Sequence, residues 1–166
     1  MEKLLISNVC KTWKTNKMNN FKIYNKTSKP TPQEKKEVIA FLFEHLQEYG
    51  DKSEDISKCF DFAVKDSKEK LGGFVLVLLE NDEIKGATII NKTGMSGYIP
   101  ENILVYIAVH ENARGKGFGK KLMNKAIELT DGDIALHVEP NNPAKHLYEK
   151  LGFENKYLEM RLKKQL

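Results

Sequence analysis

The chain has 166 residues, of which 40% are hydrophobic and 30% charged, proportions typical of a soluble globular protein. This length suffices for one domain with a hydrophobic core and is short for two domains that share a site. The 27 basic and 23 acidic residues give a formal net charge of +4, but both signs are interspersed, which is weak support for nucleic acid binding. No apolar run is long enough to cross a bilayer and no export signal is recognisable, so we expect a cytoplasmic protein without a membrane partner.

Cysteine and histidine spacing gives no indication of a disulfide or a metal site. Cys10 and Cys59 are widely separated and belong to no CxxC pair, so reduced thiols are expected. The four histidines lack HExxH spacing, and the HVEP segment at 137–140 lacks the later CxxC that a zinc deaminase would need. We therefore predict no metal.

The first half of the chain predicts one strand and two helices. Residues 1–19, rich in lysine and asparagine, are interpreted as an N-terminal extension, and residues 20–166 as a single domain. FKIYNK at 21–26 has strand composition, and apolar residues at helical spacing predict a helix between Pro32 and Gly50. Ser53 is expected to open a second amphipathic helix, which must end before the glycine pair at 72 and 73.

The middle of the chain predicts a hairpin followed by a buried strand. Residues 74–80 and 84–90 are rich in strand-forming residues and are joined by turn residues, as in an antiparallel pair. A glycine-containing loop at 91–100 follows. NILVYIAV at 102–109 is apolar at both odd and even positions, so we predict a central strand covered on both faces.

The last third predicts alternating helices and strands. A helix is expected from Phe118 to about residue 131, a strand at 133–138, and a short helix from Pro143 to Leu151. The tail at 153–164 alternates well enough for one or two final strands. Strands linked both by hairpins and by helices predict a mixed α/β fold, with a mixed sheet flanked by helices on both faces.

A glycine-rich turn between the 102–109 strand and the following helix has the composition of an anion-binding site. Glycines let consecutive backbone N–H groups converge on a phosphate, and a helix N-terminus adds positive potential. The turn lacks the GxxxxGK[ST] pattern of a Walker loop, and Lys120 stands where a dinucleotide fingerprint requires glycine. A tight connection without a ligand is the alternative reading. The basic residues nearby are Arg114, Lys116, Lys120, Lys121 and Lys125.

Two segments resemble the motifs of the GNAT superfamily of N-acetyltransferases. IAVHENARGKGFGKKLM contains the R/QxxGxG/A pattern at Arg114, Gly117 and Gly119. HVEPNNPAKHLYEKLGF resembles a second family segment, NxxAxxLYxxxGF, and the positions that match are Asn141, Ala144, Leu147, Tyr148, Gly152 and Phe153. Together the motifs span about residues 102–153, and their joint occurrence in this order is far more specific than either alone.

The resemblance implies a sheet splayed between the strands ending at Val109 and near Val138, with acetyl-CoA as co-substrate in the opening. Pantetheine would pair with the backbone of the first strand, the pyrophosphate would bind the glycine turn, and Asn141 would contact the pantetheine arm. Tyr148 would point toward the thioester sulfur and act in catalysis. The cofactor-binding residues implied in this way are Ile107, Ala108, Val109, Arg114, Gly115, Lys116, Gly117, Phe118, Gly119, Lys120, Asn141, Ala144 and Tyr148.

The catalytic base is left unassigned. Family members often place a carboxylate on the central strand, where this sequence has Tyr106 and apolar residues. Glu101 and Glu139 flank the two motif strands, although solvated strand ends are the simpler reading of both. The acceptor is expected to be an amine of a small molecule or a peptide, and a homodimer is the commonest assembly. The alternatives are a non-catalytic acyl-CoA-binding module and a basic nucleic-acid-binding protein.

Overall fold

A computed structural model of the chain describes residues 19–65 and 71–164, so the predicted extension lies, except for Asn19, outside the described residues. Five strands form one sheet in the order β1-β2-β3-β4-β5, in which the first four are antiparallel neighbours and β5 is parallel to β4. The strands are β1 (Asn19–Tyr24), β2 (Gly73–Glu80), β3 (Glu83–Lys92), β4 (Asn102–Val109) and β5 (Ile134–Leu136).

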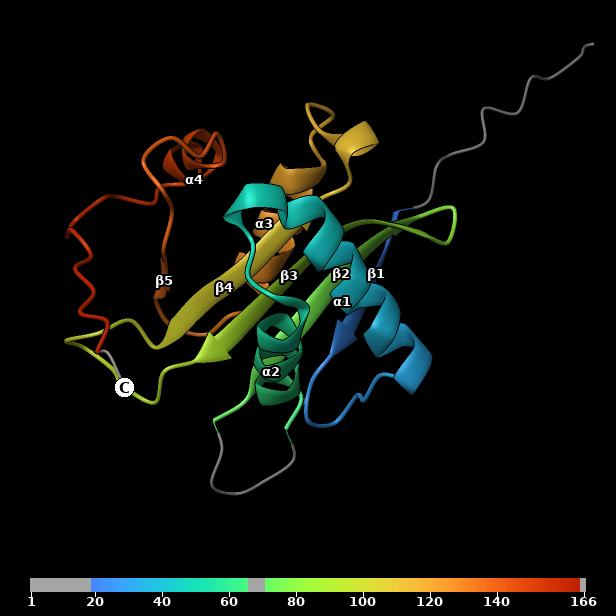
Figure 1. Ribbon diagram of the computed structural model, residues 1–166, viewed down its shortest axis with the longest axis horizontal. Coiled ribbons are helices and arrows are strands. Elements are labelled where there is room, and N and C mark those ends of the chain that lie inside the picture. Colours follow the sequence, from blue (N-terminus) through green and yellow to red (C-terminus); the bar gives the residue numbers. More distant parts are fainter. Residues whose placement is uncertain (1–18, 66–70, 165–166) are drawn as a thin grey trace, which may run out of the picture.

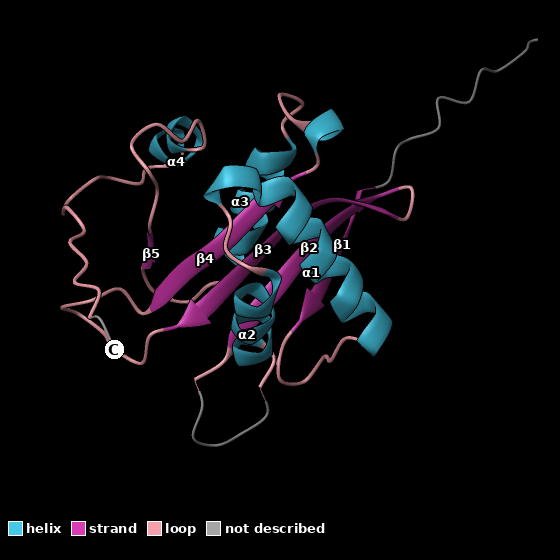
Figure 2. Cartoon of the chain, viewed as in Figure 1, coloured by secondary structure: helices cyan, strands magenta, loops and turns pink. Residues whose placement is uncertain are grey.

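Helices cover both faces of this sheet, as predicted (Figures 1 and 2). Side chains of α1 and α2 form one core layer with one sheet face, and α3 and α4 form a second layer with the other face. The helices are α1 (Pro32–Leu46), α2 (Ser53–Ala63), α3 (Phe118–Glu128) and α4 (Lys145–Lys150), with short 3-10 turns η1 (Gln47–Tyr49) and η2 (Glu111–Ala113).

The two early helices begin in different ways. Thr31 caps α1 by accepting a hydrogen bond from the Glu34 N–H, and the Glu34 carboxylate accepts one from the Thr31 N–H in return. The prediction that Ser53 opens α2 is confirmed, since Ser53 is the first helical residue; the N-cap is Lys52, which makes no side-chain capping hydrogen bond. Glu54 and Asp55 in the first turn still favour the helix through its dipole.

A β-bulge in β4 interrupts its pairing with β3. Ile89 of β3 pairs with Tyr106 and Ile90 with Leu104, so Val105 has no partner in the register. The bulge puts Tyr106 in the core layer under α1 and α2 and Leu104 in the layer under α3, although residues two positions apart share a face in a regular strand. Pairing with β5 covers only residues 102–104 of β4. Figure 1 shows the chain beyond β5 diverging from β4 toward α4. β3, rather than β4, is the middle strand.

The prediction of strands in the C-terminal tail is wrong within the described residues, where 153–164 contain none. A strand needs a partner for its backbone hydrogen bonds, and β5 offers only three residues of edge. The predicted strand at 133–138 is likewise shorter in the structure. Large apolar side chains of the tail are exposed, namely Tyr157, Leu158, Met160 and Leu162.

Candidate active site

The C-terminal half of β4 presents backbone groups along an edge that β5 does not cover. The His110 N–H donates to the Lys85 carbonyl, and bonding alternates along an antiparallel pair, so Ala108 and Tyr106 also face β3. The N–H and C=O groups of Ile107 and Val109 therefore point to the opposite edge. This arrangement suits pairing with the amides of an extended ligand arm.

The glycine turn follows directly from that edge. Gly115 and Gly117 have φ angles of 72° and 83°, in the left-handed region that favours glycine, and a Cβ at either position would meet nothing within 4 Å. Gly117 is the N-cap of α3 and supplies no side-chain cap, so the first N–H groups of the helix remain available to an anion. The residues present therefore fit a pyrophosphate.

The other residues of the turn divide into packing and charged positions. A Cβ on Gly119 would lie 3.2 Å from a methyl of Leu147, so this glycine allows α4 to approach α3 closely. Phe118 is buried in the core and offers only its backbone to a ligand. Lys120 is exposed, and Lys116 donates to the Asn112 carbonyl at 2.7 Å.

Arg114 connects the turn to the C-terminal end of α1. Its Nη2 donates to the His45 carbonyl at 2.9 Å and its Nε to the Val109 carbonyl at 3.3 Å. The cation also lies at the negative end of the helix dipole. His45 is buried against His110, with ring centroids 4.5 Å apart, and burial followed by the charge of His110 lowers the pKa of His45. Arg114 thus fixes the turn relative to α1.

Tyr148 is buried on α4, with only 6% of its surface exposed, and its ring lies 5.9 Å from that of Phe153. Burial raises the pKa of Tyr148 to about 12. Within the described residues its hydroxyl has no protein hydrogen-bond partner, so the proton remains free to be donated. Asn141 is exposed between β5 and α4, and Ala144 precedes α4, where its N–H donates to the Asn142 side chain at 2.9 Å.

The two carboxylates considered as bases have different surroundings. Glu101 accepts a hydrogen bond from the Asp133 N–H at 2.8 Å, and backbone hydrogen bonds hold its pKa below the usual value. It stabilises the turn that leads into β5. Glu139 is exposed beyond β5. Burial and Glu48 raise the pKa of Tyr49 most, and the charge of Glu139 adds the smallest part.

Sequence reasoning missed a carboxylate that the fold brings to β4. The Tyr106 hydroxyl donates to Oδ2 of Asp51 at 2.6 Å, although the two residues are 55 positions apart. Burial, followed by this hydrogen bond, raises the pKa of Tyr106. Asp51 lies in the short connection between η1 and α2, and no motif or periodicity marks it. The two residues meet only in the folded chain, where this connection crosses β4 (Figure 1).

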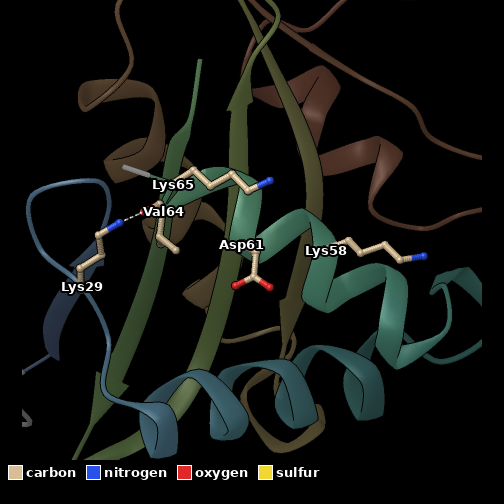
Figure 3. A pocket seen from close by; sticks show the side chains of 5 residues that line it. All are labelled: Lys29, Lys58, Asp61, Val64 and Lys65. Carbon is tan, nitrogen blue, oxygen red and sulfur yellow. Dashed lines mark hydrogen bonds between the residues drawn. The ribbon is translucent and has the colours of Figure 1, made fainter. Parts of the chain in front are cut away.

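A shallow pocket elsewhere on the surface lies between the β1–α1 connection and the end of α2 (Figure 3). Lys29 reaches across it to the Val64 carbonyl. Its lining contains no residue of β4, β5, α3 or α4, so it is separate from the turn and the open strand edge. The lining residues are Lys29, Lys58, Asp61, Val64 and Lys65.

Comparison with known families identifies the class of the protein. The family model described as an acetyltransferase (GNAT) domain matches residues 71–155, about half of the chain. The chain belongs to the GNAT acetyltransferase family and is an enzyme of the acyltransferase class. Among residues 19–65 and 71–164, no helix is long and apolar enough to span a membrane, and no three His, Cys, Asp or Glu residues gather as a metal site.

Individual relatives are N-acetyltransferases by name. A 5-NmdU N-acetyltransferase of Pseudomonas phage PaMx11 is 28% identical over 75% of this chain and 84% of its own length. The [ribosomal protein bS18]-alanine N-acetyltransferase of Haemophilus influenzae is 37% identical, over 47% of this chain and 53% of the relative.

Solved structures support the fold. An aminoglycoside N-acetyltransferase AAC(6')-Iy in complex with CoA aligns with a TM-score of 0.65 and 14% identity, covering 90% of this chain and 96% of that one. A ribosomal-protein-alanine N-acetyltransferase from Brucella melitensis aligns with a TM-score of 0.58 and 17% identity, over 88% and 99% of the two chains.

Proposed function

We propose that the chain transfers an acetyl group from acetyl-CoA to a primary amine. The observation that carries this proposal is the uncovered edge of β4, which runs directly into the glycine turn at the N-terminus of α3. An extended arm paired with Ile107 and Val109 would place its pyrophosphate at Gly115 and Gly117. Family membership supports acyl transfer as the chemistry.

The reaction joins the amine nitrogen to the thioester carbon and then breaks the C–S bond. The nitrogen loses a proton to water, and the sulfur leaves as a thiolate that takes up a proton. With a pKa of about 12, Tyr148 keeps its proton and is a weak acid toward a thiolate whose conjugate thiol has a pKa near 8.5. We assign Tyr148 a hydrogen bond to the sulfur, which stabilises charge that develops in the transition state.

The acceptor class is a primary amine on a small molecule or a peptide. The relatives' names provide two amines to examine first, 5-NmdU and the alanine of ribosomal protein bS18. The matched part of the second relative is about half of its length, so its acceptor is one member of a panel rather than an assignment.

Thiol release tests this function. Purified protein is mixed with acetyl-CoA and each of 5-NmdU, ribosomal protein bS18 and an alanine-initiated peptide, and free CoA and the acetylated product are both measured. We expect amine-dependent release of CoA in equal amounts with acetylated product. Tight acetyl-CoA binding without release of CoA would instead favour a non-catalytic acyl-CoA-binding module. Salt-sensitive nucleic acid binding, with neither acetyl-CoA binding nor CoA release, would contradict both the acetyltransferase and the binding module.

A further inference from the structure

We propose that Asp51 binds the ammonium group of the acceptor as it docks and holds its nitrogen beside the thioester, with Tyr106 as the residue that positions the carboxylate. Before attack the ammonium gives one proton to water, because only the neutral amine has a lone pair to form the N–C bond, and the second proton is lost as the C–S bond breaks. This inference rests on the proposed function and adds to it a recognition site and a charge preference. The pair is built from the η1–α2 connection and β4.

Tyr106 places Asp51 near the expected site of the thioester. Tyr106 directly follows the bulge residue Val105, where β4 loses its pairing with β5, and it directly precedes Ile107 on the uncovered edge. A carboxylate 2.6 Å from the Tyr106 hydroxyl is therefore held beside the strand segment that would carry the acetyl end of the ligand. Asp51 itself is exposed, so an acceptor can reach it from solvent.

The Tyr106 oxygen and the second Asp51 oxygen are hydrogen-bond acceptors. Tyr106 gives its only proton to Asp51, so its oxygen can accept but not donate. The Cys59 thiol, which accepts a hydrogen bond from the Asn91 side-chain amide at 3.3 Å, lies near the pair. Asp51 also lies close enough for its charge to raise the pKa of that thiol, after the larger effect of burial.

These acceptors match an ammonium group better than a neutral or anionic acceptor. An ammonium offers three N–H donors and a positive charge, and the second oxygen of Asp51 provides a charge-assisted partner. The charged neighbours of Asp51 are mixed. The hydrogen bond to Glu159 and its charge raise the pKa of Arg161 most, and the charge of Asp51 adds a smaller part. Burial and Asp51 raise the pKa of Tyr106 most, and the charge of Asp55 adds the smallest part. The arrangement therefore points to a cationic primary amine as the preferred acceptor.

Four variants test the assignment by separating the KM for the amine from kcat. Asp51→Asn removes the charge with almost no change of shape, and Asp51→Glu restores the charge. Tyr106→Phe removes the positioning hydroxyl. Asp55→Asn is the matched control, because it removes an equal charge at the start of α2 from a carboxylate that pairs with Lys58 at 2.8 Å.

The variants are assayed with whichever of 5-NmdU, ribosomal protein bS18 and the alanine-initiated peptide gives the fastest turnover. Asp51→Asn should raise the KM for this amine about 10-fold or more, as expected for loss of a hydrogen bond to a charged group. Tyr106→Phe should raise it less, Asp51→Glu should recover part of the loss, and Asp55→Asn should change it less than about twofold. The KM for acetyl-CoA and the melting temperature should stay near wild type, which separates lost recognition from lost structure.

An unchanged amine KM in both Asp51→Asn and Tyr106→Phe, with wild-type turnover intact, would overturn this inference and leave the proposed function standing. An equal rise in Asp55→Asn would also overturn it, because the effect would then be general electrostatics. Absence of amine-dependent CoA release in wild type would overturn the proposed function itself, and the assignment of Asp51 with it.

Discussion

Tyr148 and Tyr24 are buried to the same extent, with 6% of each surface exposed, but their surroundings differ. Tyr24 lies on β1, and a hydrogen bond to Glu34 contributes to the rise of its pKa, after burial and the charge of Glu34. Burial alone raises the pKa of Tyr148. Among the described residues the Tyr148 hydroxyl has no protein hydrogen-bond partner, so it is available for the hydrogen bond to sulfur proposed above.

We predict that Tyr148→Phe lowers kcat about 10- to 100-fold, because the lost interaction is a hydrogen bond to developing negative charge. The dissociation constant of acetyl-CoA should change little, since that hydrogen bond strengthens only as the C–S bond breaks. Steady-state kinetics and calorimetric titration measure the two quantities. Tyr24→Phe is the control for loss of a tyrosine hydroxyl from a residue with the same exposed fraction and should leave kcat near wild type; an undiminished kcat in Tyr148→Phe would remove Tyr148 from catalysis.

Motif spacing in the sequence identified individual candidate site residues, but it did not identify a residue whose role depends on tertiary contact. Tyr148 and the glycines lie at fixed intervals in two local patterns, so counting along the chain finds them. Asp51 acquires its candidate role only from contact with Tyr106, at a separation of 55 positions. No local pattern contains that information.

The glycine turn before α3 has left-handed backbone conformations that favour glycine, and the space where a Cβ would lie is empty. Alanine at Gly117, whose φ is 83°, would cost about 1–2 kcal/mol and would place a methyl group where a phosphate is expected. Gly97 has a φ of 77° and equally open surroundings, but it lies in the β3–β4 connection, at the opposite end of β4 from the turn. The two glycines therefore form a matched pair for mutation.

Gly117→Ala and Gly97→Ala should lower the melting temperature by similar amounts, roughly 2–8 °C for a chain of this length. Only Gly117→Ala should weaken acetyl-CoA binding, by about 10-fold or more, because only that turn is expected to hold the pyrophosphate. Thermal denaturation and calorimetric titration provide the readouts. Equal affinities in the two variants would move the phosphate site away from the turn.

Most elements were predictable from the sequence because periodicity and turn residues report local structure. The 102–109 strand agrees with β4 at both ends, and α3 begins at the expected Phe118. The bulge at Val105 was not predictable, since apolar residues fill every position around it. In the tail at 153–164, alternation predicted strands that the structure lacks. A strand forms only where a partner edge is free to pair with it, and whether such an edge exists depends on the whole sheet.

The whole molecule is a GNAT acetyltransferase whose five-stranded sheet opens between β4 and β5. The bulge turns Tyr106 toward α1 and α2, while Ile107 and Val109 face the opening. The proposed amine site and the proposed acetyl-CoA site therefore meet at consecutive residues of one strand. Direct acyl transfer requires this arrangement, since both reactants must bind together.

Thermal denaturation with acetyl-CoA, CoA, ATP and NAD, each tested separately, is the most direct test of this account. A ligand present at about 100 times its dissociation constant adds roughly 2.7 kcal/mol to the free energy of unfolding. At this chain length we predict a rise in melting temperature of about 5–10 °C with acetyl-CoA and CoA, and little change with ATP or NAD. No rise with either CoA ligand, or an equal rise with all four, would contradict the assignment of the β4 edge and the glycine turn to acetyl-CoA.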